Sequence, residues 1–174
     1  HEVAALERLH AAGLPVPQPL GMGSNVVLMA YVGDAKAAAP TLARAQVPRA
    51  DAARVLDELL DAVGRMLGLG LVHGDLSAYN VLWWDGRPTL IDFPQVVDVR
   101  ANPAARELFE RDVARLCAHF ARLGAPRDPR EVAETLWRQH VPHDLWLEHS
   151  AAFVAARAAS EGERDGARPA RGRG

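Results

Sequence analysis

The sequence predicts an α+β fold made of a strand, a β-hairpin and a mostly helical body. Apolar residues recur at helical spacing along residues 55–67, and a helical period returns after residue 102. Between these segments, Asp85-Gly86 separates two short β-prone runs, and this dipeptide favours a two-residue hairpin turn. We therefore expect helices to provide most of the core.

The first part of the chain predicts a helix, a strand and a loop. Residues 2–12 have a helical pattern that Gly13 and two following prolines end. The apolar run at residues 26–32 predicts a buried strand, and residues 21–23 before it predict a turn. Residues 34–49 are rich in Ala and Pro and lack a clear period, so we expect a loop there.

The middle of the chain predicts a long helix followed by the hairpin. The apolar face of residues 55–67 ends at Gly68 and Gly70, which are typical of helix ends. Residues 81–84 and 87–91 are the two hairpin strands. A two-residue turn between them places Trp84 opposite Arg87 and Val81 opposite Leu90.

The remainder of the chain is predicted to be helical. Asn102-Pro103 predicts a helix start, with Asn as the cap and Pro at the first helical position. The apolar stripe that follows ends at Gly124. The segment 128–131 has the spacing of a capping box and opens another helix. A last helix is expected over residues 144–159.

Composition limits the class of protein. The chain has 174 residues, enough for one domain with a core. It has 20 Lys and Arg against 22 Asp and Glu, so the sequence carries no direct nucleic-acid signature. The single cysteine, Cys117, excludes an intramolecular disulfide and favours a cytoplasmic compartment. No apolar run approaches the ~20 residues that span a bilayer.

Three polar side chains are expected to meet at the open end of the hairpin. Extending the strand pairing past the strand ends brings Asn80 and Asp92 together. Asp75 lies on the loop that leads into the hairpin. Two carboxylates and an amide oxygen are suited to bind Mg²⁺ together with phosphates.

Phosphoryl transfer requires this combination of groups. One carboxylate orients and deprotonates the attacking hydroxyl, and other ligands hold the metal that bridges the phosphates. In this hypothesis Asp75 has the first role, and Asn80 and Asp92 have the second. Each residue alone would also fit a solvated loop or a strand end. Together they have the kinase spacing Asp-x-x-x-x-Asn followed by Asp-Phe after a hairpin.

The segment 73–80, HGDLSAYN, resembles the signature of RIO-type atypical protein kinases. The segment 91–95, IDFPQ, resembles the metal-binding motif of that family. Ser77 stands where ordinary protein kinases have Lys, as in RIO proteins. Similarity to the Glu-bearing helix at residues 2–6 and to the hinge at residues 28–33 extends the resemblance upstream.

A further match lies in the helical body, where Arg111-Asp112-Val113 resembles the late-helix Arg-Asp pair of the family. The resemblance covers about residues 1–123 and implies a protein-kinase-like fold. Residues 1–33 would be the end of the small lobe with the hinge, and residues 34–159 a mostly helical large lobe. The tail, residues 160–174, lacks large apolar residues and is expected to be disordered.

The resemblance implies a serine kinase or ATPase that transfers the γ-phosphoryl group of ATP with Mg²⁺. The adenine would contact the backbone of Ala30 and Val32. Met29 would close the back of the pocket, and Leu82 and Ile91 would line it. Met29 and Leu82 would fit equally well as ordinary core residues.

Two parts of a RIO active site are expected upstream of Glu2, namely the Gly-rich loop and the Lys that anchors ATP. Lys36 follows the hinge and cannot replace that Lys. We therefore expect this chain to be truncated and to be weakly active or inactive alone. His73 is expected to brace the loop rather than to react. Ala78 stands where the family has Glu, which affects partner contacts more than chemistry.

Two other functions remain open. A small-molecule phosphotransferase of the aminoglycoside or choline kinase type also uses His-Gly-Asp-x-x-x-x-Asn, although the segment 76–79 looks more like RIO. A non-catalytic nucleotide-binding scaffold is the other, and intact Asp75, Asn80 and Asp92 argue against it. The family resemblance implies a protein substrate or a ribosome-assembly partner, and the oligomeric state stays open.

Overall fold

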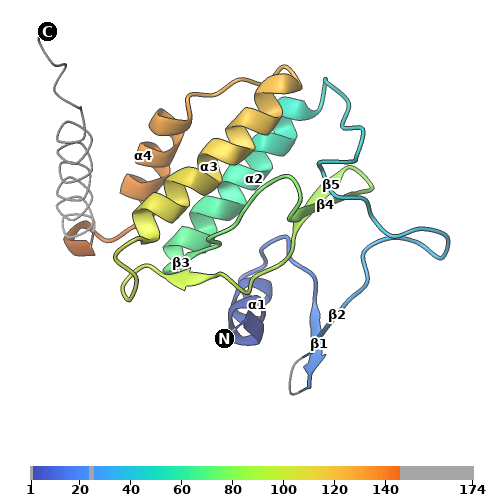
Figure 1. Cartoon of the computed structure of the whole chain (residues 1–174), viewed down its shortest axis with the longest axis horizontal. Coiled ribbons are helices and arrows are strands. Elements are labelled where there is room, and N and C mark those ends of the chain that lie inside the picture. Colours follow the sequence, from blue (N-terminus) through green and yellow to red (C-terminus); the bar gives the residue numbers. More distant parts are fainter. Residues whose placement is uncertain (1, 24–25, 146–174) are drawn as a thin grey trace, which may run out of the picture.

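Three helices pack against one another, each touching the other two, in the computed structural model, which describes residues 2–23 and 26–145 (Figure 1). A shorter N-terminal helix and a two-stranded ribbon lie on the other side of the connecting loops from these three helices (Figure 1). The three packed helices are α2 (Ala52–Gly68), α3 (Ala105–Arg122) and α4 (Pro129–His140), and the N-terminal helix is α1 (Glu2–Ala11). All but the first two residues of the helix expected over 144–159, and the whole tail 160–174, lie outside the described residues.

The described strands form three separate antiparallel pairs. The ribbon pairs β1 (Pro19–Met22) with β2 (Val27–Met29), and the hairpin pairs β4 (Val81–Trp84) with β5 (Arg87–Leu90). The third pair joins two-residue strands, β3 (Leu71–Val72) and β6 (Val97–Asp98), that the sequence did not predict. Helices and small antiparallel sheets together confirm the expected α+β class.

The hairpin has the predicted register. Val81 pairs with Leu90 and Trp84 with Arg87. Asp85 and Gly86 both have positive φ, 49° and 75°, as a type I′ turn requires. The predicted second strand ends one residue early, at Leu90.

The long helix α2 owes its place in the core to its apolar face. Val55, Leu56 and Leu59 are fully buried, as the helical spacing predicts. Arg54 at the other side of the helix donates to the Gly86 carbonyl of the hairpin turn, at 3.3 Å. This contact ties the tip of the hairpin to α2.

The helix α4 begins where the capping-box pattern predicts. Asp128 accepts hydrogen bonds from the backbone nitrogens of Arg130 (2.8 Å) and Glu131 (3.4 Å), and Pro129 occupies the first helical turn. Trp137 of this helix packs on Phe109 of α3 with the ring centroids 5.5 Å apart. The two aromatic side chains join α3 and α4 within the core.

The helix α3 begins later than predicted. It starts at Ala105, and Ala104 is its N-cap. The Asn102 side chain accepts a hydrogen bond from the Ala104 nitrogen at 2.9 Å, so it closes the turn before the helix instead of capping the helix. The prediction of a cap at Asn102 and a first helical residue at Pro103 was therefore wrong.

The buried strand predicted over residues 26–32 was also wrong in length and burial. β2 has only three residues, and Val26 and Leu28 are 66% and 58% exposed. Among the described residues β2 pairs with β1 alone, and a two-stranded ribbon packed on one side leaves its other face open. Gly21 and Met22, expected in a turn, belong to β1.

No helix in the described ranges is long and apolar enough to cross a membrane.

The caps of α4 and α2 allow a matched test of the capping interaction. Replacing Asp128 by Ala removes the acceptor of two backbone N–H groups, so the free energy of unfolding should fall by about 1 kcal/mol. Asp51, the N-cap residue of α2, makes no side-chain capping bond. Asp51→Ala should therefore change the free energy of unfolding by less than about 0.5 kcal/mol in the same urea titrations. Equal losses in the two variants would contradict this account.

Candidate active site

The loop between β3 and β4 carries the first of the predicted site residues. Asp75 lies on it with a side chain that is 42% exposed. Asn80, at the end of the loop, donates from Nδ2 to the backbone carbonyl of Asp75 at 2.8 Å, and the same nitrogen lies 3.5 Å from Asp75 Oδ2. The amide therefore fixes the loop and contacts the carboxylate.

The hairpin brings the second predicted metal ligand to the same end of the structure. The Ile91 nitrogen donates to the Asn80 carbonyl at 3.0 Å, which extends the strand pairing by one step as expected. Asp92 follows directly, is exposed, and has φ of +70°. Non-glycine residues rarely adopt this left-handed conformation, and such residues often occur at functional sites.

A single cavity of about 370 Å³ connects most of the predicted residues. The apolar or backbone part of its lining comes from the ribbon, the residues next to it and the hairpin, and the polar part from the start of α1 and the ends of the hairpin. Its lining consists of Glu2, Pro17, Met29, Ala30, Val32, Asn80, Leu82, Ile91 and Asp92. All five residues predicted for the adenine pocket and both predicted metal ligands are in this set, whereas Asp75 is not.

The residues at this cavity offer few metal ligands of their own. Within residues 2–23 and 26–145, no three His, Cys, Asp or Glu side chains cluster so that they could hold an ion. Asn80 and Asp92 supply one amide and one carboxylate. These oxygens fit a Mg²⁺ ion that takes its other ligands from phosphates and water, which is how proteins usually hold this ion.

His73 braces the loop from inside the core. It is 3% exposed, its ring lies 5.0 Å from the Phe93 ring, and its Nε2 lies 3.1 Å from the Ile91 carbonyl. A carbonyl oxygen only accepts, so Nε2 carries the proton. Burial lowers the pKa of His73, against the opposing effects of the Ile91 bond and of the Asp92 and Asp75 charges. A neutral His73 thus links the Asp75 loop to the residue before Asp92.

One turn of α3 holds the same loop from the other side. Asp112, which is 1% exposed, accepts from the backbone nitrogens of Gly74 (2.8 Å) and Leu76 (3.0 Å). Arg111 donates to the Gly74 carbonyl. The residues on both sides of Asp75 are therefore fixed by buried or half-buried contacts to one helix.

The environment of Asp112 has opposing effects on the pKa of its carboxyl group. Burial raises its pKa to about 6, while the two backbone N–H bonds and the charges of Arg111 and Arg115 act in the opposite direction. At neutral pH the group is mainly a carboxylate, and this is the form that accepts both N–H donors.

Arg115 is a site residue that the sequence reasoning missed. Its guanidinium donates from Nη1 to Asp75 Oδ1 at 2.8 Å. Arg111 and Arg115 are four residues apart and thus share one face of α3. This spacing was visible in the sequence, but the pairing with a loop residue 40 positions away was not.

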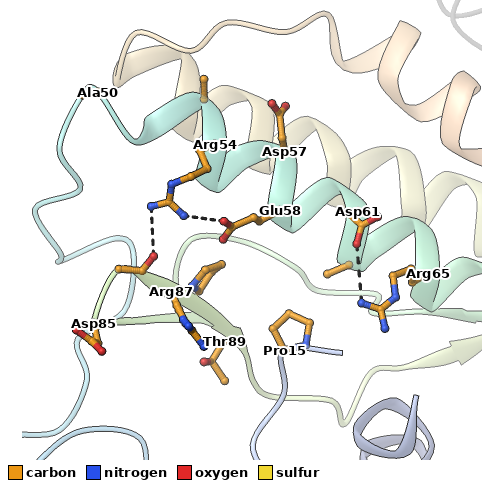
Figure 2. Close-up of a pocket in the computed structure, with 14 residues that line it drawn as sticks. Pro15, Ala50, Arg54, Asp57, Glu58, Asp61, Arg65, Asp85, Arg87 and Thr89 are labelled. Atoms are coloured by element: carbon orange, nitrogen blue, oxygen red, sulfur yellow. Dashed lines mark hydrogen bonds and ion pairs between the residues drawn. The ribbon is translucent and has the colours of Figure 1, made fainter. Parts of the chain in front are cut away.

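A larger groove of about 1400 Å³ lies between α2 and the hairpin turn (Figure 2). It contains none of the predicted site residues. Along α2, Arg54 pairs with Glu58 at 2.6 Å and Arg65 with Asp61 at 3.9 Å, and Arg54 also donates to the Gly86 carbonyl of the hairpin turn. The two ion pairs lie within α2, and the contact with Gly86 joins this helix to the hairpin.

Comparison with known proteins gives one consistent family. A RIO domain sequence model matches residues 1–132. The RIO-type serine/threonine-protein kinase Rio1 of Thermoplasma acidophilum is 32% identical over 76% of this chain and 68% of its own length. Its counterpart of the same name in Haloferax volcanii is 37% identical over 73% of this chain. The human serine/threonine-protein kinase RIO1 is 30% identical over 82% of this chain.

The match covers different shares of these relatives. It spans 43% of the Haloferax volcanii protein and 25% of the human protein. The longer relatives therefore contain much sequence that this chain does not match.

Two glycines with similar backbone conformations test how tightly the Asp75 loop is packed. Gly74 and Gly86 have φ of +81° and +75°, but only at Gly74 would a Cβ collide with a backbone atom, the Gln95 carbonyl oxygen. Gly86→Ala should lower the free energy of unfolding by about 1–2 kcal/mol through its backbone conformation alone. Gly74→Ala should lower it by about 1–3 kcal/mol more, because the collision is added. Equal unfolding free energies for the two variants would show that the loop can yield at Gly74.

The buried carboxyl of Asp112 predicts a pH dependence. Its folded pKa of about 6 exceeds the ordinary 3.8, so between these values the folded protein binds more protons than the unfolded chain. This group's contribution to stability is complete below about pH 4 and is lost as the pH rises through 6, a change of about 3 kcal/mol. Carbon-13 NMR of the carboxyl carbon, assigned with an Asp112→Asn variant, measures the midpoint directly. A midpoint below 4 would mean that the N–H donors outweigh burial.

Proposed function

The chain belongs to the RIO domain family, and from this premise we propose that its protein transfers the γ-phosphoryl group of ATP, with Mg²⁺, to a serine hydroxyl of a protein. The relatives are named serine/threonine-protein kinases, which supports kinase activity at the level of the family. The observation that carries the proposal for this chain is the 370 Å³ cavity, because it gathers the predicted nucleotide-pocket and metal-ligand residues.

The hinge backbone supports adenine recognition. The Ala30 nitrogen donates to the Gln18 carbonyl at 2.8 Å, and the Val32 carbonyl accepts from the Ala39 nitrogen at 2.9 Å. Within the described part of the chain this leaves the Ala30 carbonyl and the Val32 N–H for a ligand. Adenine offers an amino donor beside a ring-nitrogen acceptor, so one carbonyl and one N–H are the complementary pair.

The apolar side chains of the cavity complete the adenine site in this proposal. Met29 and Leu82 are on β2 and β4, and Ile91 directly follows β5. Together they would cover the faces of a planar base and exclude water from it. The roles of these side chains follow from the family resemblance and from their shared cavity.

Asn80 and Asp92 would hold Mg²⁺ with the ATP phosphates, since both line the polar end of the cavity. The ion, when bound, neutralises the charge that develops on the transferred phosphoryl group. Asn80 Nδ2 is engaged by Asp75, so the amide oxygen is the end available to the metal. Asp92 contributes the negative charge.

Asp75 would act on the acceptor hydroxyl. Its carboxylate is half-exposed and lies beside Asn80, outside the lining of the cavity. This position suits a base that receives the serine proton while the serine oxygen bonds to the γ-phosphorus. The bond between phosphorus and the bridging oxygen breaks, and ADP leaves.

In this proposal residues 1–33 form the end of a small lobe with the hinge, and residues 34–159 form the large lobe. The cavity lies between α1, the ribbon and the hairpin, which is where two such lobes would meet. A cytoplasmic location and a protein or ribosome-assembly partner are further proposals that rest on the family resemblance.

The roles of Asp75 and Asp92 can be separated by kinetics of the full-length protein with γ-labelled ATP, Mg²⁺ and dephosphorylated casein. Asp92→Asn should lower transfer on the order of 10²-fold or more and weaken the Mg²⁺ dependence, because charge stabilisation is lost. Asp75→Asn should lower kcat on the order of 10²–10⁴-fold and leave the KM for ATP within a few-fold. Asp61→Asn, an exposed change in the groove of Figure 2, is the control.

The identity of the phosphoryl acceptor distinguishes the proposed protein kinase from the two alternative functions. Efficient transfer to kanamycin or choline, with none to protein serine, would support a small-molecule phosphotransferase instead. ATP binding without transfer or phosphate release would support a scaffold. Wild-type rates in both Asp variants would overturn the proposed chemistry.

A further inference from the structure

Both oxygens of the Asp75 carboxylate have neighbours, and the neighbours differ. Oδ1 accepts from the Arg115 guanidinium at 2.8 Å. Oδ2 has only the Asn80 amide at 3.5 Å, a distance at which a hydrogen bond is weak. Oδ2 is thus the carboxylate oxygen beside Asn80, and Asn80 lines the cavity of the proposed phosphate site.

The ion pair between Arg115 and Asp75 contributes little to stability. The two side chains are 41% and 42% exposed, and pairs as exposed as this are screened by water and salt. The contact is nevertheless short, and it is made to the residue proposed as the general base. We therefore look for its role in the orientation of that residue.

The backbone of Arg115 belongs to the helix that binds the Asp75 loop. It is on α3 one turn after Arg111 and Asp112, which bind the backbone of the Asp75 loop at Gly74 and Leu76. The loop and the helix therefore form one unit around Asp75. Within this unit, the Arg115 contact is the one interaction among the described residues that fixes the rotation of the carboxylate through Oδ1.

We propose that Arg115 is a positioning residue for phosphoryl transfer. It holds Asp75 Oδ1 so that Oδ2, beside Asn80, is the oxygen that receives the hydrogen bond of the acceptor hydroxyl. This inference rests on the proposed function and adds a residue to it. The orienting contact comes from a long side chain on a helix, so the loop sequence alone does not determine the geometry of the base.

The test compares Arg115→Ala with the wild type in the full-length protein, using γ-labelled ATP, Mg²⁺ and dephosphorylated casein. The kcat should fall on the order of tenfold or more, because a freely rotating carboxylate loses its productive orientation. The KM for ATP should stay within about twofold and the thermal midpoint within about 2 °C, because the pair is exposed.

Two further variants make the result specific. Arg115→Lys retains a cationic donor for the single bond to Oδ1, so kcat should return to within about threefold of the wild type. Arg127→Ala removes an ion pair of similar exposure, 40% and 60%, between Arg127 and Asp57 at 3.2 Å. This pair is remote from the loop, so that variant should keep the wild-type kcat.

The outcomes distinguish this inference from the proposed function. A wild-type kcat in Arg115→Ala, with transfer abolished in Asp75→Asn, would overturn the role of Arg115 alone. A loss of kcat that parallels a loss of thermal stability would also overturn it, because the role would then be structural. A wild-type rate in Asp75→Asn would overturn the proposed function and this inference together.

Discussion

The buried carboxylate of Asp112 is the constraint on which the candidate site depends. It accepts two backbone N–H groups, at Gly74 and Leu76, and so fixes the backbone on both sides of Asp75. Its helix, α3, is itself fixed by core packing through Phe109 and Trp137. The position of a half-exposed carboxylate on a loop is therefore determined by the helical core. Loop residues alone would not give this precision.

The sequence predicted the parts of the structure that local chemistry decides. Asp85-Gly86 specifies a turn with two positive φ values, and this turn fixed the register of the hairpin. The register then brought Asn80 and Ile91 together, one residue before Asp92. Asp128 likewise capped α4 because its oxygen reaches N–H groups two and three residues away. In each case the deciding interaction lies within a few residues of the pattern.

The predictions from the sequence failed where contacts with residues far along the chain determine the structure. The burial of residues 26–32 depended on what covers the ribbon, and an apolar run cannot show that. The Asn102 side chain could cap a helix or close the turn before it, and it closes the turn. Arg115 is an ordinary helix residue in the sequence. Its contact with Asp75 exists only because α3 and the loop pack together, so no spacing rule would have found it.

The orientation of the Asn80 amide separates two negative groups electrically. Its nitrogen end, which carries positive partial charge, contacts the carbonyl and carboxylate of Asp75. Its oxygen end, which carries negative partial charge, is left for the cavity that Asp92 also lines. The amide dipole thus stabilises charge on Asp75 while it adds to the attraction of Asp92 for a cation. In the proposed function, a neutral side chain would thereby let one carboxylate serve a proton and the other a metal within a single site.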